Sequence, residues 1–246
     1  MRYINEILFF AVILIANVIQ GITGFAGTVL AMPPAVMLVG LDTAKPILNL
    51  LGLLSGLYVV VTAGKYINKK EFFKTSAVMT VGIIAGIFIK DKLHGNPEIL
   101  YIILGVVVTA VGVIGAVHSF ILKSPPKKQG KFVSWLMLTV AGVVHGLFVC
   151  GGPLIVSYFS AEIEDKNEFR STISAVWVVL NGFIFIDDLR MGHWHADTVK
   201  LFVPAAVVMV AAMFIGSILY KKMSRSVFMK VTFVLLMISG VALLLK

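Results

Sequence analysis

The sequence predicts an all-α polytopic membrane protein made of two inverted repeats, each a broken-helix hairpin followed by three transmembrane helices. Of its 246 residues, 59% are hydrophobic and only 13% are charged, whereas a soluble domain has about 25% charged residues. Six apolar segments are long enough to cross a bilayer, which takes roughly 20 residues of helix. Two further apolar stretches are longer than one crossing requires, and a cluster of glycines interrupts each of them.

These two glycine clusters occupy matching positions in the two halves of the chain. Residues 20–28 read Gln-Gly-Ile-Thr-Gly-Phe-Ala-Gly-Thr, and residues 145–153 read His-Gly-Leu-Phe-Val-Cys-Gly-Gly-Pro. The same shift of 125 residues, from position 20 to position 145, aligns Lys45 with Arg170. Paired Gly/Pro interruptions in corresponding halves of a hydrophobic chain are typical of the binding site of a transporter.

The apolar segments set the expected boundaries. Residues 1–20 resemble a signal peptide, but the apolar run continues to about residue 39, so we expect them to be retained. The alternation of apolar and polar residues that a membrane β-barrel needs is not seen. The first repeat is expected over residues 1–122, with the hairpin at 4–40 and spans at 45–64, 72–90 and 98–122. A cytoplasmic linker is expected over residues 123–131. The second repeat is expected over residues 132–246, with the hairpin at 132–161 and spans at 168–189, 197–220 and 226–245.

The basic residues predict the orientation. Twelve of the 21 Lys and Arg residues form three patches, within residues 65–74, 123–131 and 221–230, and each patch lies between apolar segments. Cytoplasmic loops carry such patches, so we expect a cell-membrane protein rather than a nucleic-acid partner, with the linker inside. The order of the spans then makes the first hairpin enter from outside and the second from inside, and it places both termini outside.

A new helix is expected to begin after each break, near residues 26–28 and near residues 151–154. The first N–H groups of a helix have no partner within it, and this end carries roughly +0.5 of a charge. Pro153 suits the start of a helix because it has no N–H to leave unpaired. Two such ends, entering from opposite faces, could meet near the midplane and bind a small anion.

The candidate substrate ligands are the residues of the breaks and the polar residues of the spans that follow. Gln20 and His145 can hydrogen-bond an oxyanion, and His145 can also carry a proton. Lys45 and Arg170 would attract an anion or, alternatively, extend to the membrane interface, and the glycines alone could serve close helix packing. The candidates are Gln20, Thr23, Gly24, Gly27, Thr28, Lys45, Asn49, His145, Cys150, Gly151, Gly152, Pro153, Arg170, Ser171 and Ser174.

Other polar residues are assigned structural roles. Asn17 and Asn181 are expected to make hydrogen bonds between helices. A polar loop outside the membrane is expected to hold Asp187, Asp188, His193, His195 and Asp197, where two histidines without a third ligand are weak evidence for a metal. Motifs of zinc proteases, P-loop enzymes and serine hydrolases are absent from the sequence, so neither enzyme activity nor a cofactor or metal is expected, although transport could be coupled to protons or another ion.

The glycine motifs carry a family resemblance. Residues 21–27, followed by Met32-Pro33, and residues 146–154, continuing to 169–172, resemble the TauE/SafE sulfite-exporter family of permeases, also called the toluene-sulfonate uptake permeases. The first motif departs from the usual glycine run at Phe25 and Thr28. The resemblance implies transport of sulfite, sulfonates, thiosulfate or related small organic anions.

Together these patterns favour a secondary transporter that carries a small anion across the bilayer by alternating access of its two halves. An anion channel of the same architecture is the first alternative. An intramembrane enzyme that uses Cys150 or His145 is a second, and a membrane scaffold without a substrate is a third.

Overall fold

The computed structural model describes residues 2–23, 26–93, 97–122 and 128–220, and nine residues between 230 and 245. The described residues form helices and connecting turns, with no strand among them, and seven helices are long and apolar enough to cross a membrane. The prediction of an all-α integral membrane protein is therefore confirmed. In chain order the elements are α1 (Arg2–Thr23), α2 (Gly27–Val39), α3 (Leu41–Ala63), η1 (Gly64–Tyr66), α4 (Lys69–Leu93), α5 (Pro97–Val117), η2 (His118–Leu122), α6 (Lys131–Phe148), α7 (Gly152–Glu162), α8 (Lys166–Arg190) and α9 (Ala196–Tyr220).

Each glycine break separates a long helix from a short one. The helices α1 and α6 have 22 and 18 residues, whereas α2 and α7 have 13 and 11. At 1.5 Å per residue, α2 and α7 are about 20 Å and 16 Å long, and neither can cross a hydrocarbon core of roughly 30 Å. Each hairpin therefore consists of a helix of spanning length and a shorter helix that turns back.

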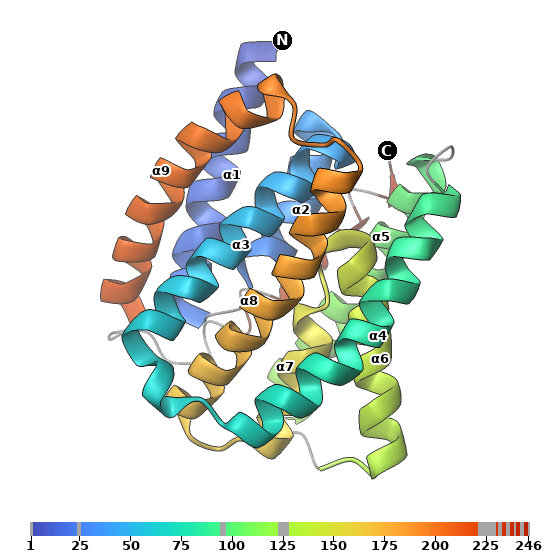
Figure 1. The fold of residues 1–246 in the computed structure, drawn as a ribbon, viewed down its shortest axis with the longest axis vertical. Helices are drawn as coiled ribbons and strands as arrows, with labels where there is room; N and C mark the ends of the chain where they lie inside the picture. Colours follow the sequence, from blue (N-terminus) through green and yellow to red (C-terminus); the bar gives the residue numbers. More distant parts are fainter. Residues whose placement is uncertain are drawn as a thin grey trace.

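The two hairpins enter the bundle from opposite ends (Figure 1). We call the end that holds Gly40 and His193 the upper end, and the end that holds Tyr66 and Glu162 the lower end, as drawn in Figure 1. The α1–α2 hairpin starts and finishes at the upper end, and the α6–α7 hairpin starts and finishes at the lower end. Gly40, with φ of 81°, provides the reversal between α2 and α3 that residues with a side chain rarely adopt.

Three helix pairs build the bundle: α1 packs against α9, α4 against α6, and α3 against α8. The outer pairs cross at glycines. A methyl group added at Gly21 would lie 3.1 Å from Gly216 Cα, and one added at Gly146 would lie 3.3 Å from Gly86 Cα. Helices approach this closely only where small residues meet, and in a membrane such close packing drives helix association. The middle pair, α3 and α8, runs antiparallel between them.

The described residues of the final segment follow α5. Phe233 lies against Gly115 and Leu244 lies against Gly105, so this segment runs antiparallel to α5. The predicted span at 226–245 otherwise lies outside the described residues.

Polar residues lie inside the bundle and apolar ones cover its surface. Phe73, Phe88 and Phe214 are each about two-thirds exposed, whereas Lys45 and Asn49 are almost fully buried. The core also holds many apolar residues, but an apolar outer surface of this kind suits a bundle whose surroundings are hydrocarbon. An ionisable residue within a membrane bundle is costly and usually functional, so the buried polar groups indicate where the function lies.

The glycine crossing of α4 and α6 gives a test of this packing. A methyl group at Gly142 would overlap backbone atoms of Met79 and approach Gly82 Cα to 3.0 Å. We expect Gly142→Ala to lower the free energy of unfolding by about 1–3 kcal/mol, the usual cost of overpacking. Gly182→Ala is the control, because a methyl group there meets nothing within 4 Å; equal stability of the two variants in detergent denaturation would contradict the assigned crossing.

Candidate functional site

At the first break, a side chain of α1 holds the start of α2. The backbone N–H of Gly27 donates to Gln20 Oε1 at 2.8 Å, and Gln20 Nε2 donates to Ser55 Oγ at 3.4 Å. The N–H groups of a helix start need partners from outside that helix. Gln20 supplies one of them, and it thereby links the two arms of the hairpin to α3.

At the second break, the backbone itself makes the turn. Val149 takes a left-handed conformation, with φ of 56°, and its N–H donates to the carbonyl of His145 at 2.7 Å. Gly151 follows, where a methyl group would overlap the carbonyl oxygen of Ala141 and come within 2.9 Å of His145 Cβ. The close return of the chain onto α6 therefore requires glycine at this position, and Pro153 stands in the first turn of α7.

Both breaks line one cavity between α3 and α8. From the first break come Gln20, Thr28 and Val29, and from the second come His145, Val149 and Gly152. The cavity is small, at about 10 Å³, which is room for about one water molecule. The first turns of α2 and α7 thus meet at the same place, and the remaining lining residues are Gly52 of α3 with Trp177 and Asn181 of α8.

His145 is the most constrained polar residue of the cavity. It is 2% exposed, its ring stacks on Trp177 with centroids 4.8 Å apart, and its Nε2 lies 2.8 Å from Asn181 Oδ1. Its Nδ1 is buried and has no hydrogen-bond partner in the described part of the chain, and neither has Asn49 Oδ1. Buried polar atoms are rarely left unpaired in proteins, so these atoms can bind a water molecule or a ligand.

The similarity of the sequence to a protein family shows where the chain belongs. The sequence profile of the family described as "Sulfite exporter TauE/SafE" matches residues 9–243. The chain belongs to the TauE/SafE family. It is therefore a membrane protein of a transporter family. Comparisons with curated proteins and with solved structures give no significant match.

The two aligned cations of this TauE/SafE protein have different partners. Arg170 Nη2 donates to the carbonyl of Gly21 at 3.4 Å, in the last turn of α1, where a cation opposes the negative end of the helix. Lys45 instead forms an ion pair with Asp188, with 3.4 Å between Nζ and Oδ1. Arg170 therefore contacts the first break, whereas Lys45 lies in a separate polar cluster.

Among the described residues, the predicted ligands Cys150, Ser171 and Ser174 are not part of the cavity lining. Cys150 is a buried free thiol. The hydroxyl groups of Ser171 and Ser174 are buried, without a hydrogen-bond partner among the described residues. The side chains of Thr23 and Pro153, and all of Gly24, lie outside what the structure describes.

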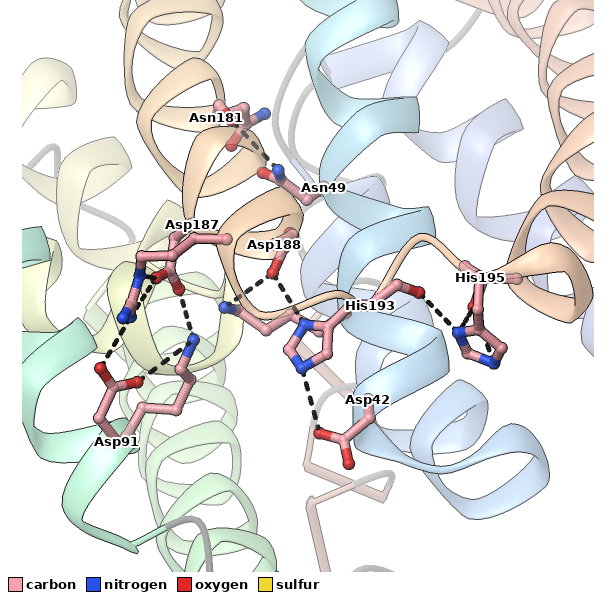
Figure 2. Close-up of polar contacts among 12 residues, drawn as sticks. Asp42, Asn49, Asp91, Asn181, Asp187, Asp188, His193 and His195 are labelled. Carbon is pink, nitrogen blue, oxygen red and sulfur yellow. Dashed lines mark hydrogen bonds and ion pairs between the residues drawn. The ribbon is translucent and has the colours of Figure 1, made fainter.

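A cluster of ion pairs joins α3, α4 and α8 at the upper end (Figure 2). Lys45 pairs with Asp188, and Lys90 pairs with Asp187. Arg190 extends the cluster by pairing with both Asp187 and Asp91 at 2.8 Å. The assignment of Asp187 and Asp188 to a loop is wrong: both are buried in the last turn of α8, because each finds a lysine on a neighbouring helix.

A second polar cluster joins α4, α7 and α8 at the lower end. Tyr158 OH donates to Glu71 Oε2 at 2.6 Å, and Asn68 Nδ2 donates to Glu168 Oε1 at 2.6 Å. The backbone N–H of Asn68 also donates to Thr172 Oγ1 at 2.9 Å. Each end of the bundle is thus closed by polar contacts between helices.

Sequence reasoning missed five residues of the cavity lining, namely Val29, Gly52, Val149, Trp177 and Asn181. The expectation that Asn181 bonds to another helix is confirmed by its contact with His145 of α6. The same expectation for Asn17 is wrong, because its side chain donates to the carbonyl of Ile13 in its own helix. The position of Asn181, a polar residue inside an apolar spanning segment, is the feature of the sequence that could have indicated its place in the site.

The hydrogen bond between Asn181 and His145 can be tested by stability. Asn181→Leu keeps the branching and the number of heavy atoms of the side chain but leaves His145 Nε2 buried without a partner, so we expect a loss of about 1–2 kcal/mol in the free energy of unfolding. Asn167→Leu, on the exposed start of the same helix, is the matched control. Equal denaturation curves for both variants would rule out the bond.

Proposed function

We propose that the protein is a secondary transporter for a small anion, such as sulfite, a sulfonate or a related organic anion, and that it works by alternating access. The observation that carries the proposal is the shared cavity, in which the first turns of α2 and α7 meet polar side chains of α1, α6 and α8. Helix starts attract anions through their free N–H groups and their partial positive charge.

The two helix ends contribute differently to anion binding. Because Gln20 already accepts the N–H of Gly27, the first break offers the hydroxyl of Thr28 and the amide of Gln20. The second break offers the backbone at Gly152 and, when protonated, Nδ1 of His145. Arg170 adds positive charge close to Gly21.

Alternating access follows from the arrangement of the helices. The opposite entry of the hairpins, and the reciprocal packing of α1 on α9 and α6 on α4, support two inverted repeats. A cavity with room for about one water molecule fits a contracted state without substrate, since sulfite is larger than water. Opening of the cavity toward the upper end would separate Lys45 from Asp188. Opening toward the lower end would separate Tyr158 from Glu71.

The basic residues support an orientation in the cell membrane. Lys65, Lys69 and Lys131 lie at the lower end, so this end faces the cytoplasm by the positive-inside rule. The upper end, where α1 begins, then faces outward, with both termini on that side.

The deciding experiment measures sulfite movement in proteoliposomes that contain the purified protein. A transporter exchanges radiolabelled internal sulfite for unlabelled external sulfite without a large current. A channel gives a current and releases the label whether or not external sulfite is present, and a scaffold gives neither current nor release. Binding is checked separately by a thermal-shift titration with sulfite, since a ligand of the native state raises its apparent stability.

The cavity assignment predicts that the Thr28 hydroxyl binds the anion. Thr28→Val keeps the shape and removes the hydroxyl, so we expect affinity for sulfite to fall about ten- to a hundredfold, because a hydrogen bond to a charged group contributes about 1.5–3 kcal/mol. Thr62→Val, on the exposed end of α3, should leave the titration unchanged. An unaltered affinity in Thr28→Val would exclude Thr28 as a ligand.

The burial of Cys150 outside the cavity lining argues against the enzyme alternative. We expect Cys150→Ala to keep the sulfite exchange rate of the parent protein, because a small buried thiol contributes packing. Loss of exchange in a stably folded variant would instead support a chemical role for the thiol.

A further inference from the structure

A chain of ionisable side chains runs from the upper surface into the bundle (Figure 2). It begins at Asp42, whose side chain is 69% exposed and whose Oδ1 lies 3.9 Å from His193 Nε2. The other ring nitrogen, Nδ1 of His193, lies 3.4 Å from Asp188 Oδ1. Lys45 Nζ lies 3.4 Å from the same oxygen. One imidazole therefore bridges an exposed carboxylate and a carboxylate that is 0% exposed.

Buried polar residues continue from this chain toward the cavity. Asn49 lies one helical turn beyond Lys45 on α3, on the same face. Its Nδ2 donates to the carbonyl of Asn181 at 3.1 Å, and the side chain of Asn181 contacts His145 at 2.8 Å. The ion-pair cluster and the proposed anion site are thus linked along the facing sides of α3 and α8.

We propose that Asp188 is the proton-binding site that couples anion transport to a proton gradient, and that His193 relays protons between Asp188 and the upper surface. The coupling role rests on the proposed transport function, whereas proton binding at Asp188 does not. Chains of Asp, Glu and His are the usual proton paths of membrane transporters.

The geometry suits Asp188 for this role. Its Oδ1 faces Lys45 and His193, while its Oδ2 is buried without a hydrogen-bond partner in the described structure. A proton can therefore be held on Oδ2 without displacing an existing donor. The neighbouring Lys90 and Asp187 form an ion pair with each other, so their charges remain paired when Asp188 is protonated.

Protonation of Asp188 would change the charge that faces the anion path. The ionisable groups around it come from α3, α4, α8 and the turn that follows α8. They are Asp42 and Lys45 of α3, Lys90 and Asp91 of α4, Asp187 and Arg190 of α8, and His193 and His195 of the following turn. Once Asp188 is neutral, Lys45 has lost its partner, so the buried region gains one positive charge. This favours an anion in the cavity and loosens the contact between α3 and α8.

The relay uses both nitrogens of His193. The imidazole takes a proton on Nε2 from water, directly or by way of Asp42, and it gives the proton on Nδ1 to Oδ1 of Asp188. A half-turn of the carboxyl group about its Cβ–Cγ bond then moves the protonated oxygen to the position without a partner. A neutral ring with its proton on Nε2 remains, and it returns to the starting tautomer by giving that proton to water and, after the ring turns, taking one from water on Nδ1. In the reverse direction, Asp188 releases its proton to Nδ1, and the proton on Nε2 leaves to the surface.

Infrared spectroscopy tests the proton site without any substrate. In the full-length protein in lipid vesicles, a pH titration should show the carbonyl band of a protonated carboxylic acid, and Asp188→Asn should remove that band. After a pH jump, the band should appear about tenfold more slowly in His193→Gln, because a relay of the acid–base type is lost. His195→Gln, two residues away and exposed, should behave as the parent protein. A parent-like spectrum in Asp188→Asn, or a parent-like rate in His193→Gln, would overturn the proposal.

Because Asp188→Asn leaves Lys45 buried without its partner and can destabilise the fold, the neutral pair Lys45→Gln/Asp188→Asn provides a second variant. It too should lose the band. If the cluster serves only as a rigid contact between helices, the infrared band should remain in the neutral pair, and the proposal would be wrong.

Vesicles with an internal pH dye then test the coupling. Under a sulfite gradient, the number of protons moved per sulfite transported should be higher for the parent protein than for the neutral pair. Equal numbers in both would overturn the coupling while leaving transport intact. If the parent protein exchanges no sulfite but shows the infrared band, the proposed transport function fails and Asp188 remains a proton site.

Discussion

The structure depends on how the backbone is satisfied where two helices stop inside the membrane. In hydrocarbon, an unpaired N–H or C=O group costs several kcal/mol, so each break needs partners from the protein. Gln20 accepts the N–H of Gly27, and Arg170 donates to the carbonyl of Gly21. At the second break the N–H of Val149 returns to His145. Two of the residues that supply these partners, Gln20 and His145, also line the cavity.

Close helix crossings place the breaks opposite one another. The glycine contacts of α1 with α9 and of α4 with α6 leave no room for side chains at the outer pairs. The polar residues, whose exposure to lipid would be energetically costly, lie on the middle pair, α3 and α8. The cavity, Asn181 and the ion pairs all lie along this central seam, which explains why one pair of helices serves both the proposed anion site and the proposed proton path.

Charges gather at the ends of that seam for a related reason. Burying a charge costs more than a single attraction recovers unless further hydrogen bonds support the pair. Lys45, Lys90, Asp187 and Asp188 satisfy this condition by bridging three helices. Such contacts hold α3, α4 and α8 in one arrangement. In the proposed mechanism, the gain or loss of one proton at Asp188 changes that arrangement. The lower cluster around Glu71 and Tyr158 closes the opposite end with fewer full charges.

The sequence by itself determined the features that depend on local composition. Apolar length indicated a helix over each described span, and the glycine clusters indicated where α2 and α7 begin, because hydrophobic period and backbone freedom are properties of short segments. The pairing of side chains was decided only by tertiary structure. Lys45 and Arg170 align in sequence, yet one meets Asp188, 143 residues away, and the other meets a helix end. Likewise Asn181 belongs to the cavity only because α8 packs between both hairpins, and no local pattern specifies which residue of a distant helix will face it.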